Sequence, residues 1–412
     1  MIDDSTLHLS CLQHYNVDNL LHYTKNLAKV HQIEWVRKNF PDYSDLIAHQ
    51  INLADKANNK LPLWFKQSCL FTPKSLEQCS SPATAKYKAG LLSYQHVLDL
   101  SGGLGVDDVA FCQQNTKKVV SLDPDETLNQ IAEFNFFRLG IYQIQRITTT
   151  AEAYLSKSPQ KFDLVYIDAD RRSADNKKIV LLHDSQPNVL ALLPAIQSVS
   201  SKLMVKLSPI IDMEYLKRIF GNTLIQIHVV GVKQEVKEVL VLIDFSTQTQ
   251  APLIKAVQLD EDGNVANQFT ETTLPDSTIT LPTEEAEEYF YEASAILIKS
   301  GLTAHYAKSV KLTLFKNSMA YMTGESLIEN YFGRSFKIIH HGIYSKRDVK
   351  SYLRTKGITK ANVSMRNFPM STDDFKKQYN LIDGGGDYLF FYSTPSGEKF
   401  FWHVVKPNQD YV

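Results

Sequence analysis

The chain has 412 residues, and its 44 Lys and Arg against 45 Asp and Glu give a formal net charge of −1 at pH 7. This near-neutral balance argues against a histone-like binder, so any nucleic acid would have to meet a local basic face. The length is too great for one hydrophobic core and predicts two to four domains.

The cysteines indicate a reducing compartment. Cys11, Cys69, Cys79 and Cys112 lack paired C-x-x-C spacing, which predicts free thiols and no zinc site. The first residues have no basic-then-apolar signal pattern, and no run of about 18 apolar residues occurs. The sequence therefore predicts a cytoplasmic protein without a metal.

Residues 1–92 are predicted to form a helical N-terminal region. Apolar residues recur there at three- and four-residue spacing from Thr6 to Asn58, which is typical of amphipathic helices. Ser81 followed by Pro82 is a favoured N-cap and first-turn pair, so we expect a helix from there to about Leu92.

Residues 93–246 alternate between short apolar strands and helical stretches. This alternation predicts an α/β fold whose core is a Rossmann-like, doubly wound parallel sheet. The last two strands are expected to form an antiparallel hairpin at its edge. The predicted strands are His96–Leu100, Lys118–Asp123, Ile144–Thr149, Phe162–Asp168, Lys202–Leu207, Leu224–Val230 and Val236–Phe245.

Two small α+β domains are predicted at residues 247–333 and 334–412. The stretch Thr247–Pro282 is rich in Thr, Asp, Asn and Gly, which indicates a linker that contains a hairpin turn at Asp260–Asn264. Glu284–Ser300 begins with acidic residues, which favour a helix N-terminus. After Gly333, strands and helices alternate again.

The stretch Val97–Gly105 runs from an apolar strand into a glycine-rich turn. Such a turn lets a ligand approach the backbone and the N-terminus of the next helix. Asp123 ends the following strand, where a carboxylate can accept hydrogen bonds from both hydroxyls of a ribose. The spacing from Asp99 through Ser101 to Gly103 and Gly105 favours S-adenosylmethionine over a dinucleotide.

A third contact to the cofactor is expected after the third strand. Enzymes of this kind usually have an Asp there for the adenine amino group, whereas this chain has Thr150. The contact is then expected from Glu152 or from the backbone. The alternative is that Thr150 caps a helix.

The fourth strand ends in Asp168-Ala-Asp170-Arg171, and we predict these two acids and Arg171 to be catalytic. Amino-methylating enzymes have Asn or Asp there, followed by Pro-Pro and an aromatic ring that stacks on the base. Only the first acid is retained here, although an Arg plane can also stack on a base. The alternative is an Asp–Arg network that caps the strand.

Other motifs leave alternatives open. Lys206, after the fifth strand, could contact phosphate or simply extend to solvent. Neither His340-His341 as a metal site nor Gly384–Asp387 as a phosphate cradle is favoured over a plain strand end and a hairpin turn. A basic set interleaved with Tyr344, Tyr352 and Phe368 predicts either an RNA-contacting face or a solvated one. Its members are Arg334, Lys337, Lys346, Arg347, Lys350, Arg354, Lys356, Lys360 and Arg366.

The chain resembles a bacterial family of class I S-adenosylmethionine-dependent methyltransferases with a ferredoxin-like insert and a C-terminal THUMP-like domain. Besides the cofactor motif, the resemblance rests on blocks that span nearly the whole chain. These blocks are Leu76–Ser81, Thr84–Lys88, Ala293–Gly301, Tyr321–Gly324, Asn362–Met370 and Asp383–Asp387.

The resemblance implies a methyltransferase core with structured RNA, either tRNA or rRNA, as its substrate. It also implies that Gln78, Ser80, Ser81 and Thr84 strap the methionyl end of the cofactor, while the Asp168–Arg171 segment faces the target base. The loss of the Pro-Pro-aromatic motif leaves two other hypotheses open. One is a catalytically silent RNA-binding scaffold, and the other is a methyltransferase that acts on a non-RNA substrate.

Overall fold

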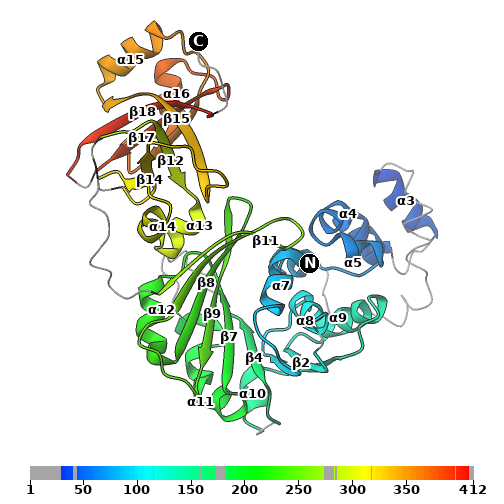
Figure 1. Ribbon diagram of the computed structural model, residues 1–412. Coiled ribbons are helices and arrows are strands. Elements are labelled where there is room, and N and C mark those ends of the chain that lie inside the picture. The colour runs from blue at the N-terminus through cyan, green and yellow to red at the C-terminus, as the bar shows by residue number, and fades with distance from the viewer. Residues whose placement is uncertain are drawn as a thin grey trace. The chain divides into compact units, whose positions relative to one another are not determined.

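A computed structural model describes residues 29–39, 44–114, 116–157, 160–171, 182–272, 283, 285–316, 318–394 and 396–407 (Figure 1). The chain divides into two compact units. The first comprises Met1–Lys233, Lys237–Leu253 and Gln258–Ala266, and the second comprises Gln234–Val236, Ile254–Val257 and Asn267–Val412. Each unit is described by itself.

Short helices make up the N-terminal region, as the apolar spacing predicts. Proline occupies the first turn of three of them, where its missing N–H costs no hydrogen bond. The last helix ends at Ala89, with Gly90 as its C-cap, about three residues before the predicted end. The helices are α3 (Lys29–Asn39), α4 (Ser44–Lys60), α5 (Pro62–Lys66), α6 (Pro73–Gln78) and α7 (Pro82–Ala89).

A nine-stranded sheet follows, in the order β11-β10-β8-β9-β7-β4-β1-β2-β3. The strands β1, β2, β3, β4 and β7 pair in parallel, and β9 is antiparallel to β7. This arrangement confirms the doubly wound core. The strands are β1 (His96–Asp99), β2 (Lys118–Asp123), β3 (Ile144–Thr148), β4 (Leu164–Asp168), β7 (Lys202–Leu207), β8 (Leu224–Val232), β9 (Glu235–Asp244), β10 (Leu253–Leu259) and β11 (Val265–Thr272).

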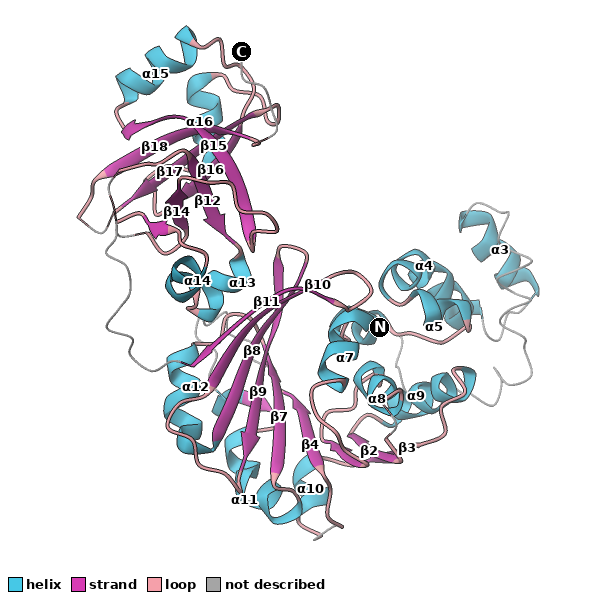
Figure 2. Ribbon diagram, in the orientation of Figure 1, coloured by secondary structure: helices cyan, strands magenta, loops and turns pink. Residues whose placement is uncertain are grey.

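Helices cover both faces of this sheet (Figure 2). Right-handed crossovers place α8 and α9, which lead from β1 to β2 and β3, on the face opposite to α11, which leads from β4 to β7. The chain therefore reverses its winding between β1 and β4, where open α/β sheets bind ligands. The helices are α8 (Val106–Cys112), α9 (Glu126–Arg138), α10 (Ala151–Leu155), α11 (Val189–Val199) and α12 (Met213–Phe220).

The predicted edge hairpin and the predicted linker both differ from the structure. The hairpin β8–β9 does not lie at the edge, because β10 and β11 extend the sheet beyond β8. Part of the expected linker therefore forms strands, although the turn at Asp260–Asn264 is present, with the Asp260 N–H donating to the Asn264 carbonyl at 3.0 Å. Gly263 fits because its Cβ position lies 2.8 Å from the Ala83 carbonyl oxygen in α7.

The second unit is built on a seven-stranded sheet in the order β13-β14-β12-β15-β18-β17-β16. Alternate residues of its strands enter two cores: Leu389 and Phe391 pack with α15 and α16, whereas Phe390 and Trp402 pack on the other side. The strands are β12 (Tyr289–Ala293), β13 (Thr313–Leu314), β14 (Tyr321–Gly324), β15 (Gly333–Ile343), β16 (Asn362–Arg366), β17 (Asp387–Ser393) and β18 (Lys399–Val405).

The predicted helix at Glu284–Ser300 is wrong in its first half. Residues Tyr289–Ala293 form β12, between β14 and β15, and only Ala295–Ser300 forms a helix, α13. The predicted domain boundary at residue 333 falls at the start of β15, within one sheet. The other helices are α14 (Thr303–Ser309), α15 (Lys346–Thr355) and α16 (Thr372–Tyr379).

Candidate active site

A cleft of about 1310 Å³ lies at the carboxyl ends of the parallel strands, entirely within the first unit. It brings together residues from four strands and from the segments that follow them, as the reversal between β1 and β4 requires. Ten of the residues predicted from the sequence to bind the cofactor or to act in catalysis line it. They are Gln78, Ser80, Asp99, Ser101, Gly103, Gly105, Asp123, Thr150, Glu152 and Asp168.

The glycine turn is shaped by its neighbours in different ways. A Cβ at Gly102 would lie 2.1 Å from the Arg146 guanidinium, and one at Gly105 (φ +87°) would lie 2.4 Å from the Phe136 ring. By contrast, Gly103 (φ +50°) has only the Ser101 carbonyl oxygen near its Cβ position, at 3.8 Å. The backbone at Gly103 is therefore the part of the turn that a ligand can approach.

Asp123 connects the end of β2 to this turn. One of its carboxylate oxygens accepts the Gly103 N–H at 3.1 Å, and the other accepts the Asp125 N–H at 2.9 Å. Asn129 donates to the Asp123 backbone carbonyl at 2.8 Å. These bonds fix the carboxylate in the cleft wall, and each oxygen retains a lone pair for a further donor.

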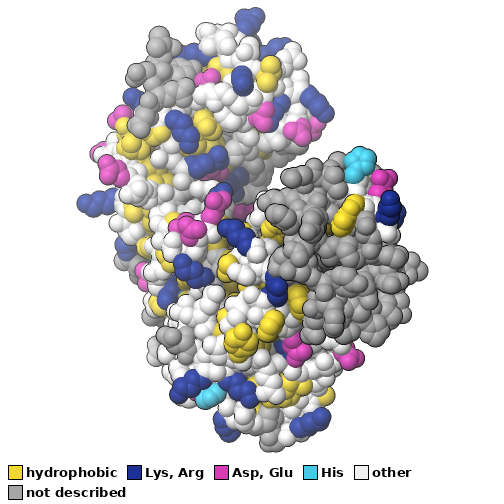
Figure 3. All heavy atoms as spheres, turned by 90° about the vertical axis from the view of Figure 1, so that its right-hand side faces the viewer, with side chains coloured by type: hydrophobic (Ala, Val, Ile, Leu, Met, Phe, Trp, Pro, Cys, Tyr) yellow, Lys and Arg dark blue, Asp and Glu magenta, His cyan; other side chains and the backbone are white. Residues whose placement is uncertain are grey.

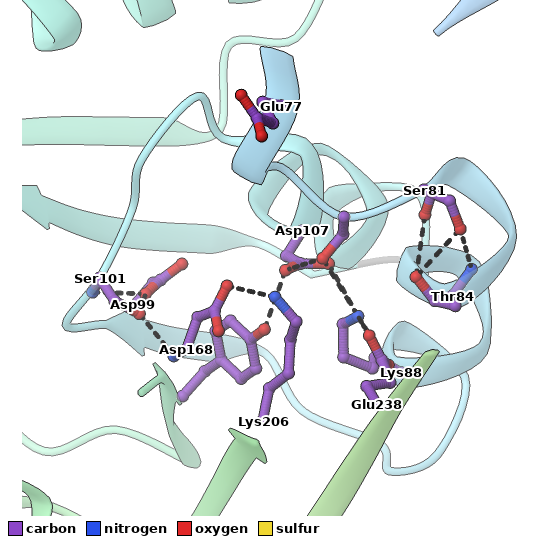
Figure 4. Close-up of polar contacts among 12 residues, drawn as sticks. Glu77, Ser81, Thr84, Lys88, Asp99, Ser101, Asp107, Asp168, Lys206 and Glu238 are labelled. Atoms are coloured by element: carbon purple, nitrogen blue, oxygen red, sulfur yellow. Dashed lines mark hydrogen bonds and ion pairs between the residues drawn. The ribbon is translucent and has the colours of Figure 1, made fainter. Parts of the chain in front are cut away.

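Asp99 links β1 to β4 through Ser101. Its carboxylate accepts the Ser101 N–H at 2.7 Å and the Ser101 hydroxyl at 3.0 Å, while that hydroxyl accepts the Asp168 N–H at 2.6 Å (Figure 4). Burial, followed by the proximity of Asp108, raises the pKa of Asp99 well above its ordinary value. Asp99 therefore holds the glycine turn through its two hydrogen bonds with Ser101.

Arg146 was not predicted to belong to the site. It lies buried in β3 and donates to the Asn129 side chain at 2.9 Å, to the Ser121 hydroxyl at 2.8 Å and to the Gly103 carbonyl at 2.9 Å. A single Arg in a strand carries no sequence signal that separates this role from an exposed position. Its contacts hold the turn in place.

Thr150 has the role that the alternative interpretation gives it, a helix cap. Its side chain caps α10 by accepting the Ala153 N–H at 3.2 Å, and it also lines the cleft. Glu152 lies in the first turn of α10, where its side chain is exposed.

Ser81 is not among the residues that line the cleft. Ser81 is the N-cap of α7, where its hydroxyl accepts the Thr84 N–H at 3.2 Å (Figure 4). Its neighbour Ser80 lines the cleft and donates to Asp107 at 2.8 Å. Gln78 also lines the cleft.

Of the residues predicted to be catalytic, Asp168 has a described side chain. Its carboxylate forms an ion pair with Lys206 on the neighbouring strand β7. The backbone of β5 (Asp170–Arg171) pairs with β6 (Ser185–Gln186). The side chains of Asp170 and Arg171 lie outside what the structure describes.

A buried group of charges adjoins this ion pair (Figure 4). Lys88 in α7 is fully buried and donates to both carboxylate oxygens of Glu238 at 2.9 Å, and it lies 3.3 Å from Asp107. Asp107 also accepts the Tyr166 hydroxyl at 2.8 Å. Although burial opposes the change, Lys88 and other partners lower the pKa of Asp107, whereas burial and then Asp107 raise the pKa of Tyr166 well above its ordinary value.

His340, from the His340-His341 motif, packs against an aromatic ring. His340 stacks on Tyr352, with ring centroids 4.4 Å apart. Within the described ranges, no group of three or more His, Cys, Asp and Glu side chains could hold a metal ion. None of the described helices is long and apolar enough to cross a membrane.

The chain is similar to known proteins in one region of its sequence and in its fold. Residues 333–404 match a family model described as THUMP domain-like. The crystal structure of a putative methyltransferase from Porphyromonas gingivalis W83 is 25% identical, with a TM-score of 0.83, over 95% of this chain and 98% of that chain. No curated protein sequence matches the chain significantly.

Two further structures align over part of the chain only. Ribosomal protein L11 methylase from Lactobacillus delbrueckii subsp. bulgaricus is 16% identical, with a TM-score of 0.30, over 41% of this chain and 77% of that chain. M. capricolum TrmK in complex with S-adenosyl-homocysteine is 14% identical, with a TM-score of 0.32, over 40% of this chain and 69% of that chain. The fold that the chain has in common with the Porphyromonas protein, together with its THUMP domain-like region, confirms the methyltransferase family resemblance found in the sequence.

Proposed function

We propose that this protein is an S-adenosylmethionine-dependent methyltransferase that modifies a base in tRNA or rRNA. The observation that carries the proposal is the bond from Gly103 N–H to Asp123, which joins the glycine turn of β1 to the carboxylate at the end of β2 inside the cleft. A backbone that a ligand can approach, next to a carboxylate held in one position, suits an adenosine cofactor.

The residues present fit the cofactor. Asp123 has lone pairs left for ribose hydroxyls, and Gly103 leaves room for a ligand beside the backbone. Thr150 and Glu152 lie where the adenine end is expected, at the start of α10. The cleft also exceeds the roughly 300–1,000 Å³ of a typical ligand pocket, which leaves room for a target base.

The bound cofactor would supply a methyl group on a positively charged sulfur. The chain must then orient the nucleophile in line with that methyl group and accept a hydrogen from it. Asp168 lies at the end of β4, lines the cleft and has a side chain that is 30% exposed. We assign to it the acceptance of the N–H of the target.

RNA as the substrate is supported by the THUMP domain-like region and by its surface. Exposed cations on α15, namely Lys346, Arg347, Lys350 and Arg354, can pair with phosphates. Over the face seen in Figure 3, Lys and Arg side chains are interspersed with acidic and apolar ones, in keeping with the low net charge. Any RNA contact is therefore local.

The basic set predicted from the sequence is only partly available for RNA. Arg334 and Arg366 both pair with Glu292. The rings of Tyr344, Tyr352 and Phe368 pack against the core beneath α15 and α16 instead of forming a stacking surface. Binding through phosphates is thus better supported than base stacking on this face.

Incubation with radiolabelled S-adenosylmethionine and total RNA from a strain that lacks the protein tests the proposal. We expect label in one RNA class, and mass spectrometry of its nucleosides should identify a methylated base that the strain lacks. Cofactor binding without transfer would favour the scaffold hypothesis. Label in protein or in a small molecule, without competition from RNA, would favour a non-RNA substrate.

A further inference from the structure

We infer that Lys206 is a positioning residue that keeps the Asp168 carboxylate ionised and directed into the cleft. This inference rests on the proposed function, because Asp168 is the group assigned there to accept a hydrogen from the target. It adds a role for Lys206 and for the buried charges behind it.

The sheet register brings the two side chains together. Asp168 and Lys206 are direct partners in the parallel pair β4–β7, at the carboxyl ends of both strands. The Lys206 ammonium donates to one carboxylate oxygen of Asp168, and both residues line the cleft. The exposed fractions are 15% for Lys206 and 30% for Asp168. The acid therefore has the more accessible surface for a substrate.

The backbone of Asp168 is held independently of Lys206. Its N–H donates to the Ser101 hydroxyl at 2.6 Å, which in turn donates to Asp99 at 3.0 Å. Loss of Lys206 would therefore leave the end of β4 in place. What the lysine controls is the charge and the direction of the carboxylate.

The Asp168–Lys206 pair belongs to a group of charges in which carboxylates already outnumber ammonium groups. Three carboxylates (Asp107, Asp168 and Glu238) share two ammonium groups, those of Lys88 and Lys206. Lys88 is committed to Glu238 by two bonds of 2.9 Å. With Lys206 removed, all three carboxylates would share one ammonium group, that of Lys88.

Asp168 is the acid that would then take up a proton. Asp107 keeps three partners: the Ser80 hydroxyl at 2.8 Å, the Tyr166 hydroxyl at 2.8 Å and Lys88 at 3.3 Å. Within the described residues, Lys206 is the cation paired with Asp168. A carboxylate that lies partly buried without a counter-ion becomes neutral.

Electrostatic shifts agree with this geometry. Burial raises the pKa of Asp168, and Lys206 opposes that effect. In the other direction, Asp168 and Asp107 raise the pKa of Lys206 despite its burial, so the lysine stays protonated and is not a base. Without Lys206, burial and Asp107 would raise the pKa of Asp168 against the smaller opposing effect of Lys88.

Direct titration of Asp168 in the full-length protein tests the inference without any substrate. In protein labelled with ¹³C at the aspartate carboxyls, the resonance lost in Asp168→Asn identifies Asp168. We expect Lys206→Met to raise its titration midpoint by about 1 to 3 pH units. Lys206→Arg, which retains the charge, and Lys202→Met, at the other end of β7, should leave it within a few tenths. An unchanged midpoint in Lys206→Met would overturn the inference.

The pH dependence of methyl transfer separates positioning from a structural role. In Lys206→Met, the acid limb of kcat/KM for total RNA should move to higher pH, with activity partly regained at alkaline pH and in Lys206→Arg. An equal loss at every pH would contradict the inference. If the wild type transfers no label, the proposed function fails, and the carboxyl titration still decides the role of Lys206.

Discussion

Among single residues, Gly105 and Gly140 show two different reasons for a glycine: a backbone conformation with positive φ, and a lack of space for a side chain. Gly105 has φ +87°, and its Cβ position lies 2.4 Å from the Phe136 ring in α9. Gly140 has φ +70° and nothing within 4 Å of its Cβ position. Both therefore favour glycine by backbone conformation, and only Gly105 does so by packing as well.

We expect Gly105→Ala to lower the free energy of unfolding by about 2–4 kcal/mol, because left-handed strain and overpacking add. Gly140→Ala, the matched control, should cost only about 1 kcal/mol from strain alone. Urea denaturation of both variants measures the difference. Equal losses in the two variants would show that the contact with Phe136 is relieved without cost.

The residue patterns predicted the acidic residues of the cleft. They did not predict the buried residues Lys88 and Arg146, which contact its walls. Asp99, Asp123 and Asp168 follow apolar strands, so their position at one sheet edge could be deduced from the sequence. Lys88 and Arg146 could not be, because their partners lie far away in the sequence. Nothing near Lys88, for example, indicates a bond to Glu238, which is 150 positions away.

Among the helices and strands, the start of α7 was predicted correctly from the sequence. Ser81 and Pro82 form the N-cap and first turn, as the sequence predicts. Ser81 was also predicted, with Gln78, Ser80 and Thr84, to contact the cofactor. Gln78 and Ser80 line the cleft, whereas Ser81 and Thr84 do not. The helix cap and the cofactor contact can be tested separately.

Ser81→Ala should lower the free energy of unfolding by about 1 kcal/mol through loss of the cap. The affinity for S-adenosylhomocysteine should stay within twofold of the wild type, because Ser81 does not line the cleft. Ser81→Asp, which retains a capping oxygen, should restore stability. If calorimetry shows a large loss of affinity in a stably folded Ser81→Ala protein, Ser81 contacts the cofactor as the sequence predicts.

The strand β12 shows why one element was mispredicted. Its acidic preceding residues favoured a helix N-terminus, but Phe290 and Tyr291 are both fully buried, on opposite faces of a strand. The partners that make it a strand, β14 and β15, follow later in the chain. Such tertiary pairing overrides local propensity and cannot be deduced from a short window.

For the whole molecule, the alternation of strands and helices was sufficient to predict the doubly wound sheet of the core. The sequence did not show that β10 and β11 extend its sheet, or that one sheet includes strands on both sides of residue 333. The polar composition resembled a linker because the turn at Asp260–Asn264 and the largely exposed strand β11 have the same kinds of residues as a linker. The THUMP domain-like region was predicted from blocks specific to the family.

We propose that the cleft at the carboxyl ends of β1 and β2 binds S-adenosylmethionine through Asp123. Calorimetric titration with S-adenosylhomocysteine tests it most directly. We predict binding by the wild type, at least about tenfold weaker binding by Asp123→Ala through loss of charge-assisted hydrogen bonds, and unchanged binding by Glu133→Ala, an exposed acid on α9. No binding by the wild type, or equal binding by Asp123→Ala, would contradict the claim.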